Sequence, residues 1–449
     1  FGLAFLLLFA LKEVEAKTIT VDDDGGADYK KIQEAIDHAS PGDTVYVYAG
    51  TYKEHVVVNK SVSIIGENMS STIVNGNGTG TVFFVNASDV TIKGFRVENG
   101  TIGIKIENSN NSAVIGNHVV YNVDAIILRY SYNCTVYQNL VENNTNRGIL
   151  VTNSQNFTVN SNYVYGSGYY GINANSSVSG VIRKNYVEEN LHDGIGLAMS
   201  SNSCLIEGNT IINNRLFGIL SELSSNNNNA YHNNIISNGI QTSGGNPTNK
   251  WDNGFEGNYW SDYTGIDLNH DGIGDSPYVI SDDSVDNHPL MGMFHSFNVS
   301  LKHSVDVISN STIDSFHYFY SNSTIRLYVS NMTTGQTHGF CRVSIPYKLM
   351  NVTNIQVMIN DGNIEVLNAN YTLYDNGTHR WIYFDYSHST RKIDIIPEFP
   401  STIMLLTILI IMTVSTFFVK KRLLRRCLLY TSDAADEGLG VDLGGRRII

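Results

Sequence analysis

One short segment of the sequence has the side chains and spacing of a calcium-binding loop. Oxygen-bearing residues occupy positions 1, 3, 5 and 9, and glycine occupies position 6, in a loop whose alternate residues point toward the ion. The residue at position 7 would contribute its backbone carbonyl. The predicted calcium ligands are Asp267, Asn269, Asp271, Ile273 and Asp275.

Position 12 of this loop departs from the calcium pattern. It is Tyr278 rather than the glutamate that supplies a bidentate carboxylate, so Asp282, Asp283 or Asp286 would have to fold back to complete the site. The alternative is an Asp-Gly turn that is stabilised by its own side chains. Both interpretations remain open from the sequence.

A second set of possible metal ligands follows within a few residues. Imidazole and thioether groups at His288, Met291, Met293 and His295 form a ligand set that would suit copper. The alternative is that the methionines fill space over the end of the domain, since methionine more often packs in a core than binds a metal.

A third set recurs at an interval of about 23 residues and therefore predicts a stripe on one face of the protein. Aromatic rings, a cation and carboxylates side by side are what a sugar chain needs for stacking and bidentate hydrogen bonds. The predicted glycan-binding residues are Asp124, Asn146, Arg147, Tyr169, Tyr170, His192 and Asp193. The alternative is a solvated edge that carries an Asp124–Arg147 ion pair.

The same stripe offers candidates for catalysis. Asp124 and Asp193 would lie three coils apart, roughly 14 Å at the spacing of neighbouring strands, which is too far for a glycosidase pair. Asp193 with His192 or Arg147 could still act as base and cation in a lyase or an epimerase. The carboxylate set of pectate lyases and the motifs of polygalacturonases are not visible.

Two columns of residues define the elements that must position this stripe. The first column is followed by isoleucine and contains Gly103, Ala125, Gly148, Gly171, Gly194 and Gly218. The second is followed two places later by valine or isoleucine and contains Asn117, Asn139, Asn162, Asn185, Asn209 and Asn234. Such a period predicts a solenoid of short strands, in which the asparagines stack into a ladder. The amphipathic segment from Tyr29 to Ala39 predicts a helix that covers the first coil.

The segment from Asp28 to Gly66, the two columns, the stretch from Gly257 to Tyr278 and His288-Pro289-Leu290-Met291 together resemble a known family. They are similar to the NosD-type, carbohydrate-binding and sugar-hydrolysis (CASH) branch of the pectate-lyase-like superfamily. The resemblance covers residues 18–292 and implies a right-handed parallel β-helix. NosD proteins are periplasmic copper-binding accessories of nitrous oxide reductase, so the resemblance also implies a copper-handling alternative.

The remaining segments predict an exported and anchored protein. Residues 1–16 resemble a truncated signal peptide, and 293–396 predict an antiparallel β-sandwich stalk after the β-helix of 17–292. Residues 397–426 hold an apolar stretch, Thr402 to Val419, followed by a basic cluster, which predicts a transmembrane anchor with its basic end inside. Pro397-Glu398-Phe399 resembles an archaeal sorting tail, although Pro400 replaces the usual glycine. Residues 427–449 resemble translated sequencing-adapter readthrough.

Composition narrows the function classes. A formal net charge of −13 without a basic stripe argues against nucleic-acid binding. The four cysteines lack metal-ligand spacing, and Asn-x-Ser/Thr sequons are abundant, for example at Asn86, Asn156 and Asn322. We therefore expect a glycan-binding or adhesive surface protein whose partner is an extracellular polysaccharide or glycoprotein. A polysaccharide lyase, hydrolase or epimerase and a copper-binding accessory protein are the alternatives.

Overall fold

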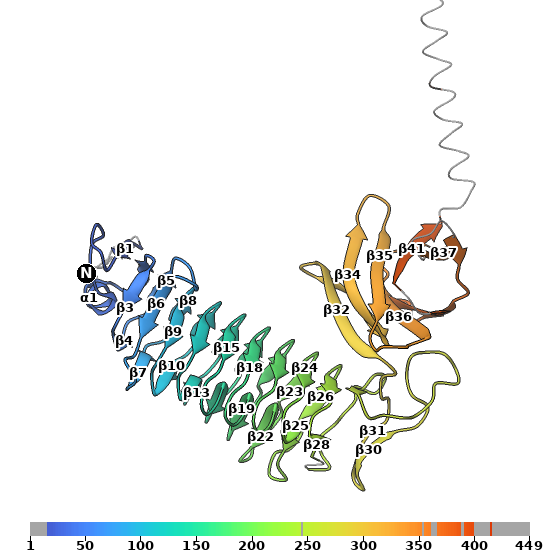
Figure 1. The fold of residues 1–449 in the computed structure, drawn as a ribbon, viewed down its shortest axis with the longest axis horizontal. Coiled ribbons are helices and arrows are strands. Elements are labelled where there is room, and N and C mark those ends of the chain that lie inside the picture. The colour runs from blue at the N-terminus through green and yellow to red at the C-terminus, as the bar shows by residue number, and fades with distance from the viewer. Residues whose placement is uncertain are drawn as a thin grey trace, which may run out of the picture.

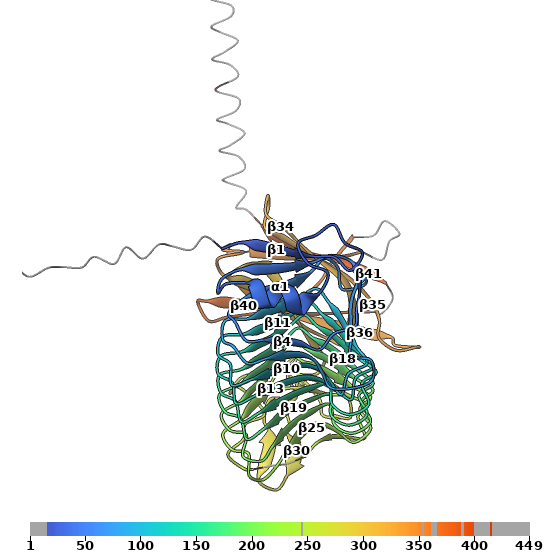
Figure 2. The same cartoon turned by 90° about the vertical axis from the view of Figure 1, so that its left-hand side faces the viewer.

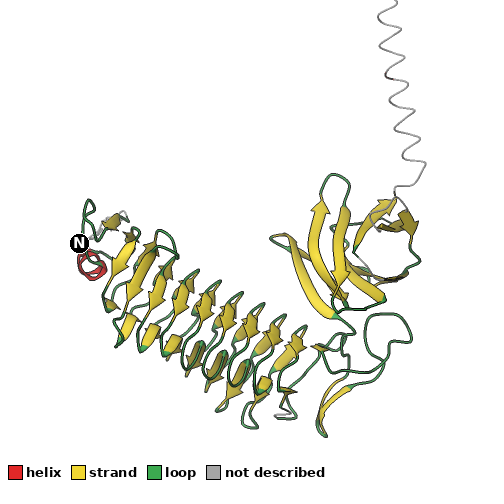
Figure 3. Ribbon diagram, viewed as in Figure 1, coloured by secondary structure: helices red, strands yellow, loops and turns green. Residues whose placement is uncertain are grey.

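The protein is a long solenoid with an antiparallel sandwich at its C-terminal end (Figure 1). The computed structural model describes residues 16–243, 246–352, 354–360, 366–387, 390–398 and 414. Each coil of the solenoid contributes one strand to each of three parallel sheets, which we call sheets A, B and C in the order in which the chain enters them. Figure 3 shows how little helix interrupts this pattern. The parallel β-helix expected from the repeat is confirmed.

The strands of the three sheets are short and follow one another along the solenoid. Sheet A contains β1 (Thr18–Val21), β2 (Thr44–Val47), β5 (Ser63–Gly66), β8 (Thr91–Lys93), β11 (Ala113–Ile115), β14 (Thr135–Tyr137), β17 (Thr158–Asn160), β20 (Val181–Arg183), β23 (Leu205–Glu207) and β26 (Asn229–Tyr231). Sheet B contains β3 (Gly50–Tyr52), β6 (Thr72–Asn75), β9 (Arg96–Glu98), β12 (His118–Val120), β15 (Leu140–Glu142), β18 (Tyr163–Tyr165), β21 (Tyr186–Glu188), β24 (Thr210–Ile212), β27 (Asn234–Ile236) and β29 (Tyr259–Trp260). Sheet C contains β4 (Val56–Val58), β7 (Thr81–Val85), β10 (Ile102–Glu107), β13 (Asp124–Arg129), β16 (Ile149–Thr152), β19 (Ile172–Asn175), β22 (Ile195–Ala198), β25 (Phe217–Ser221) and β28 (Ile240–Thr242).

Stacked aliphatic side chains fill the interior of the solenoid. In sheet A, Val136, Val159, Ile182 and Ile206 are neighbours in successive coils, and each is at most 1% exposed. Burial of each such side chain stabilises the fold by roughly 1.5–3 kcal/mol. The glycine column lies where sheet C begins. Glycine is required there because a Cβ atom on Gly148 would stand 2.5 Å from the carbonyl oxygen of Gly171.

The predicted asparagine ladder lies at the corner between sheets A and B. Each buried side chain accepts a hydrogen bond from the backbone N–H of the preceding coil; Asn139 N–H, for example, donates to Asn162 Oδ1 at 2.9 Å. The ladder begins at Phe95, whose N–H donates to Asn117 Oδ1. One predicted member was wrong: Asn233, not Asn234, occupies the ladder and accepts from Asn209 N–H at 3.0 Å. Each of these asparagines is followed two places later by isoleucine, and the register of the stacked coils places Asn233 in the ladder.

Two further ladders occupy the other corners and were not predicted. At the corner between sheets B and C the stacked residues are Asn122, Asn144, Ser167, Asn190, Asn214 and Asn238. At the corner between sheets C and A they are Ser109, Ser131, Ser154, Ser177, Ser201 and Ser225. Apart from the side chain of Ser167, these groups pair backbone atoms that the turn would otherwise leave buried without partners.

Both ends of the solenoid are covered. The helix α1 (Ile32–His38) packs Ile32, Ala35 and Ile36 over the first coil, as expected, and Figure 2 shows it lying across that end. At the other end a hairpin of β30 (Tyr278–Ser281) and β31 (Ser284–Asp286) closes the last coil. Asp286 takes the place of a further ladder residue, because Asn258 N–H donates to its Oδ2 at 2.8 Å.

The C-terminal unit is made of two five-stranded antiparallel sheets. The first contains β32 (Met293–Ser300), β33 (His303–Ser309), β36 (His338–Pro346), β40 (His379–Ser387) and β39 (Thr372–Asp375). The second contains β34 (Ser311–Phe319), β35 (Thr324–Asn331), β41 (Arg391–Glu398), β37 (Asn354–Asn360) and β38 (Val366–Asn368). Val343, Phe384 and Ile393 belong to their shared core, and β41 runs two residues past the predicted end of this unit.

Several predictions concern segments outside the described residues. These are the signal peptide up to residue 15, the apolar stretch of 402–419 apart from Val414, the basic cluster that follows it, and the tail of 427–449. Within the described ranges, no helix has the length and apolar character that crossing a membrane requires.

Candidate functional site

The predicted stripe lies at the corner that leads into sheet C, where successive coils stack its residues. The backbone N–H of Tyr169 donates to the carbonyl of Asn146 at 2.8 Å, and that of His192 donates to the carbonyl of Tyr169 at 3.1 Å. The repeat therefore placed these residues correctly side by side, although they come from three different coils.

Three rings form the centre of the stripe. The ring centroids of Tyr169 and His192 are 4.3 Å apart, those of Tyr169 and Tyr170 are also 4.3 Å apart, and those of Tyr170 and His192 are 5.2 Å apart. Tyr169 is 38% exposed, so part of this cluster faces solvent. Burial and a hydrogen bond with Tyr169 raise the pKa of the Tyr170 hydroxyl, so this phenol stays protonated at physiological pH.

A glycine on the next coil makes room for the Asn173 amide. A Cβ atom on Gly196 would lie 2.7 Å from Asn173 Nδ2, whereas its distance of 3.5 Å from two carbons of the Tyr170 ring is an ordinary contact. Any larger residue would push the amide outward. The outer surface of sheet C is thus shaped by Tyr170, Asn173 and Gly196 together.

Asp193 is buried beneath this surface. Its side chain is fully buried; Oδ1 accepts from the backbone N–H of Phe217 at 3.0 Å, and Oδ2 lies 3.1 Å from His192 Nδ1. Burial raises the pKa of the Asp193 carboxyl above its ordinary value. Asp193 therefore reaches a bound molecule only through His192, whose side chain is 29% exposed.

The other end of the stripe is occupied by internal contacts. Asp124 Oδ1 accepts from Asn146 Nδ2 at 2.9 Å and from the backbone N–H of Arg147 at 3.3 Å. The Arg147 guanidinium lies 3.7 Å from the same oxygen, which is the ion pair weighed as the alternative. Asp124 and Asp193 each have separate partners, so the structure does not pair them as two catalytic carboxylates.

Buried polar atoms without a hydrogen-bond partner are concentrated in the coils that carry the stripe. Ten such side-chain atoms occur among the described residues, and six of them lie between positions 147 and 193. Those six are Arg147 Nε, Ser167 Oγ, Asn173 Oδ1, Asn175 Oδ1, His192 Nδ1 and Asp193 Oδ2. The last two are close to each other but lack the alignment of a hydrogen bond. Folded proteins rarely leave such groups without a partner, so ordered water or another polar group would complete their hydrogen bonds.

Sequence reasoning missed Asn173 and Asn175, although a signal existed for Asn173. Both lie on β19, where Asn173 is the neighbour of Leu150 on the outer face of sheet C. The corresponding residues of the two preceding coils, Ile127 and Leu150, are apolar. An asparagine that interrupts an apolar column outside the ladders is the feature that would have identified the position.

The predicted calcium loop is held together by its own hydrogen bonds. The two carboxylate oxygens of Asp267 accept from the backbone N–H groups of Asp271 and Gly272 at 3.1 and 2.8 Å. Asn269 Nδ2 donates to Asp271 Oδ2 at 3.0 Å, and Asp275 Oδ2 accepts from Leu268 N–H at 2.6 Å. These hydrogen bonds are the ones expected for an Asp-Gly turn that is stabilised by its own side chains.

The predicted copper ligands have different surroundings. His288 Nδ1 lies 3.5 Å from Asp252 Oδ1, and Met291 packs against an apolar cluster that includes Leu290 and Phe294. Burial lowers the pKa of His295 to about 4, and its ring stacks on Phe297. Met293 and His295 lie on β32. Within the described part of the chain, no group of three or more His, Cys, Asp or Glu side chains is placed to hold a metal ion.

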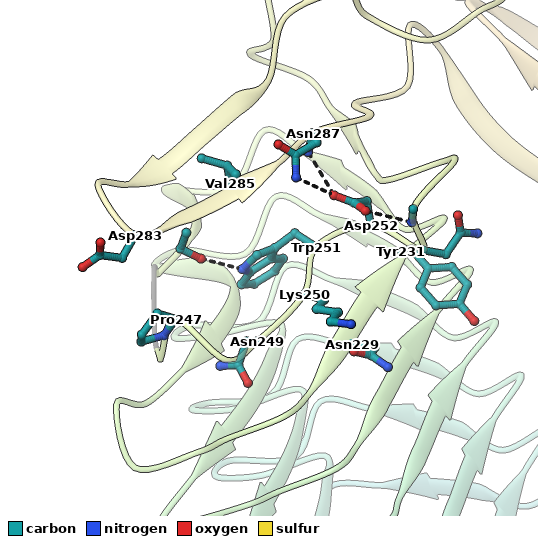
Figure 4. Close-up of a pocket in the computed structure, with 13 residues that line it drawn as sticks. Asn229, Tyr231, Pro247, Asn249, Lys250, Trp251, Asp252, Asp283, Val285 and Asn287 are labelled. Carbon is teal, nitrogen blue, oxygen red and sulfur yellow. Dashed lines mark hydrogen bonds between the residues drawn. The ribbon is translucent and has the colours of Figure 1, made fainter.

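Two cavities lie near the C-terminal end of the solenoid. One, of about 590 Å³, is polar and is bordered by Lys250, Asp252 and Asn287; Figure 4 shows the two hydrogen bonds from Asn287 to Asp252. The second, of about 600 Å³, lies against the sandwich and is lined by aromatic residues such as Trp381 and Tyr374. Neither cavity includes a residue of the stripe.

Contacts with the sandwich fix this end of the solenoid. Asn234 accepts from Phe294 N–H at 2.7 Å and donates to its carbonyl at 2.9 Å. Glu256 is paired with both Arg342 and His232. Burial opposes ionisation of Glu256, but its hydrogen bonds and electrostatic interactions with His232 and Arg342 outweigh burial and lower its pKa to about 2.

Two curated proteins resemble parts of the chain. A stretch of 94 residues is 33% identical to the cell surface glycoprotein of Methanothermus fervidus, covering 20% of this chain and 16% of that protein. A stretch of 116 residues is 34% identical to the probable pectinesterase/pectinesterase inhibitor 6 of Arabidopsis thaliana, covering 23% and 20%. The chain therefore spans about a fifth or less of the length of these relatives.

Two solved structures of epimerases are similar to part of the chain at low sequence identity. The A-module of the mannuronan C-5 epimerase AlgE4 of Azotobacter vinelandii is 16% identical, with 50% of this chain and 92% of that chain covered and a TM-score of 0.38. The periplasmic alginate epimerase AlgG is 17% identical, with 52% and 65% covered and a TM-score of 0.39.

A family model extends over a much larger part of the sequence. The model described as periplasmic copper-binding protein (NosD) matches residues 36–265, which include the end of α1, the stripe and nearly all of the coils. This match covers more than half of the chain, and the protein belongs to the NosD family.

Proposed function

We propose that the outer surface of sheet C binds a polysaccharide chain outside the cytoplasm, with Tyr169, Tyr170 and His192 as its centre. The observation that carries this proposal is the partly exposed cluster of three rings, with Asn173, whose amide oxygen lacks a hydrogen-bond partner, on the same face of sheet C. A sugar offers both an apolar face for stacking and hydroxyl groups for hydrogen bonds. The solenoid repeats its surface at each coil, which suits a repeating ligand.

Binding is favoured over catalysis at this surface. Asp193 lies beneath His192 and is fully buried, while Asp124 is committed to Asn146 and Arg147. An acid–base reaction on a sugar needs a proton-transferring group within hydrogen-bond reach of the reacting atom. We therefore propose a binding or adhesive role in preference to a lyase, hydrolase or epimerase reaction, and we assign His192, Arg147 and Asp193 to ligand positioning.

The relatives support a location outside the cytoplasm. The matching family is described as periplasmic, and one relative is a cell surface glycoprotein. A polysaccharide or glycoprotein of the cell exterior is accordingly the partner that we propose. The anchor predicted for residues 402–419 would hold the protein at the membrane, with the solenoid outside.

A matched pair of tyrosine variants tests the binding surface. Tyr169 is 38% exposed in the stripe, and Tyr186 is 37% exposed on sheet B. We expect Tyr169→Ala to weaken binding to the polysaccharides retained on a glycan array by about tenfold, equivalent to about 1.4 kcal/mol. Tyr186→Ala should leave binding unchanged. Equal losses in both variants, or no retained polysaccharide for the unaltered protein, would contradict the proposal.

Copper handling is the second candidate, because the family is described as copper-binding. His295 favours it among the predicted ligands, since its Nε2 atom is buried without a hydrogen-bond partner. Calorimetric titration with Cu²⁺ should then show binding that His295→Ala abolishes. The same titration with Ca²⁺ and Asp271→Ala examines the calcium site proposed for Asp267, Asn269, Asp271, Ile273 and Asp275. An unchanged metal affinity in the variant would remove the corresponding ion from the proposal.

A further inference from the structure

Potential N-glycosylation sites are distributed very unevenly along the solenoid. The sequence contains ten Asn-x-Ser/Thr sequons between positions 59 and 175, none between 176 and 297, and seven between 298 and 376. Asn246 is not counted, because the proline that follows it prevents glycosylation. The ten begin at Asn59, Asn68, Asn77, Asn86, Asn99, Asn110, Asn133, Asn143, Asn156 and Asn175. Asparagine itself is about equally common in both halves of the solenoid, with 22 residues in the first interval and 19 in the second. The difference therefore lies in the sequons and not in the supply of asparagine.

The sequon asparagines occupy positions that a glycan could reach. Eight of the ten are exposed and two are partly buried, whereas the ladder asparagines are buried. No ladder asparagine carries a sequon. The two uses of asparagine are thus separated: one kind is buried and closes hydrogen bonds inside the corners, and the other kind is exposed or partly exposed at the surface.

Corner geometry places several of these amides along both edges of sheet C. Asn133 and Asn156 follow one another at the corner between sheets C and A, with φ angles of 56° and 52°. Asn99 and Asn143 lie at the corner between sheets B and C, with φ angles of 56° and 54°. Glycans on these residues would flank sheet C on both sides in the first coils.

The same corners continue into the second half of the solenoid with asparagine but without sequons. Asn213 lies at the corner between sheets B and C with a φ of 55°, and Asn227 lies at the corner between sheets C and A with a φ of 56°. The residues two places later are Arg215 and Asn229, where the earlier coils have Thr145 and Thr158. Architecture alone does not explain the change at these two positions, because the asparagine and its backbone conformation are kept there, whereas Ser179, Glu189 and Ser203 occupy the matching positions of other coils.

We propose that N-linked glycans cover the coils up to residue 175 and the sandwich, and that residues 176–297 form a glycan-free surface. In the modification, Nδ2 of asparagine bonds to C1 of a sugar carried by a lipid-linked phosphate donor. The C1–O bond breaks with its electron pair passing to the phosphate, and Nδ2 loses one proton. The bare surface begins beside the Tyr170 ring and includes His192, Gly196 and Phe217.

The glycosylation does not depend on the function proposed above, but a second statement does. We infer that the glycan-free coils are kept bare so that the polysaccharide can lie along sheet C, and this part rests on the proposed function. The glycan of Asn143 would then bound the ligand site on the side of Asp124 and Arg147. The ligand would extend from Tyr169 toward β25 rather than toward β13.

A transplanted sequon tests both statements. Arg215→Thr in the full chain gives Asn213 a sequon of the form Asn-Asn-Thr, which reproduces the native Asn143-Asn144-Thr145 at the same corner. Arg215 is exposed, so the change removes no core contact. The protein is made in a host that attaches N-glycans to exported proteins, and mass spectrometry of its peptides reports which sites are occupied. The double variant Asn213→Gln/Arg215→Thr keeps the threonine but lacks the asparagine to which the glycan would be attached.

We expect glycans at Asn143 in the unaltered protein and at both Asn143 and Asn213 in Arg215→Thr. Binding to the polysaccharide found on the array should fall at least about tenfold in Arg215→Thr and return in the double variant. Unmodified peptides at all ten positions would overturn the glycan coat. An occupied Asn213 with unchanged binding would overturn the bare ligand surface. If the unaltered protein binds no polysaccharide, the proposed function fails, while the occupancy of the ten sites still decides the coat.

Discussion

Asparagine side chains form hydrogen-bonded ladders at two corners of the solenoid, but only one of these two ladders is complete. Between sheets A and B the ladder is continuous from Asn117 to Asn258 and ends on Asp286. Between sheets B and C it is interrupted by Ser167, whose buried hydroxyl has no partner. The interruption falls in the coil that carries Tyr169 and Tyr170. The corner between sheets A and B is thus completely hydrogen-bonded, whereas the corner beneath the proposed ligand is not.

The largest expected effect comes from breaking the complete ladder. Asn162 Oδ1 accepts from Asn139 N–H, and its Nδ2 donates to the carbonyl of Val136 and to Asn185 Oδ1. Asn162→Ala leaves these buried groups unpaired, so we expect a loss of about 4 kcal/mol in the free energy of unfolding. Urea denaturation measures the loss. Gln155→Ala, which removes an exposed amide at the neighbouring corner, is the control and should change stability by less than about 0.5 kcal/mol; equal effects would refute the role of the ladder.

The end of the ladder should respond to pH. Burial raises the pKa of Asp286 to about 6, above the ordinary value of 3.8, even though Asn258 N–H, Trp260 Nε1 and His288 N–H donate to it. A carboxyl whose pKa is higher in the folded state stabilises the fold most at low pH, and this contribution is lost as the pH rises through about 6. Between about pH 4 and about pH 8 the loss should reach about 2 kcal/mol.

Asp286→Asn isolates this contribution, because asparagine keeps an acceptor oxygen and does not titrate. Thermal unfolding of both proteins between about pH 4 and about pH 8 gives the difference in free energy at each pH. We expect the unaltered protein to lose stability relative to Asp286→Asn as the pH rises. Parallel curves would show that Asp286 does not titrate in this range.

The smallest effect should come from completing the interrupted ladder. Ser167→Asn would provide an amide oxygen that accepts a hydrogen bond from Asn144 N–H. This bond would match the one that Asn122 N–H donates to Asn144 Oδ1 at 2.9 Å. The side chain would lie beside Gly148, as Asn190 lies beside Gly171. We expect a gain of about 1 kcal/mol in the free energy of unfolding by urea denaturation. A loss of stability would mean that this corner has no space for the amide.

The sequence disclosed the fold more completely than the site. A column such as Asn139, Asn162 and Asn185 recurs at a fixed interval, and only stacking explains it. The prediction placed Asn234 instead of Asn233 in the ladder, because both asparagines fit the same pattern. The second ladder was missed because Ser167 interrupts its column of asparagines. The burial of Asp193 and the unpaired amide oxygen of Asn173 depend on how far each side chain stands above the sheet. A repeat locates a residue on a coil but does not give its depth.

The direction of the ladders has a consequence for how this protein can change in length. Every ladder asparagine accepts from the coil before it, so internal coils other than the one that carries Ser167 present the same ladder donors and acceptors at their two faces. A duplicate of such a coil could therefore enter between two coils of this kind without a new ladder interface, while α1 and Asp286 mark positions that must stay terminal. Solenoids built in this way can lengthen or shorten by whole coils during evolution, and their reach along a polymer changes in steps of one strand spacing, about 4.8 Å.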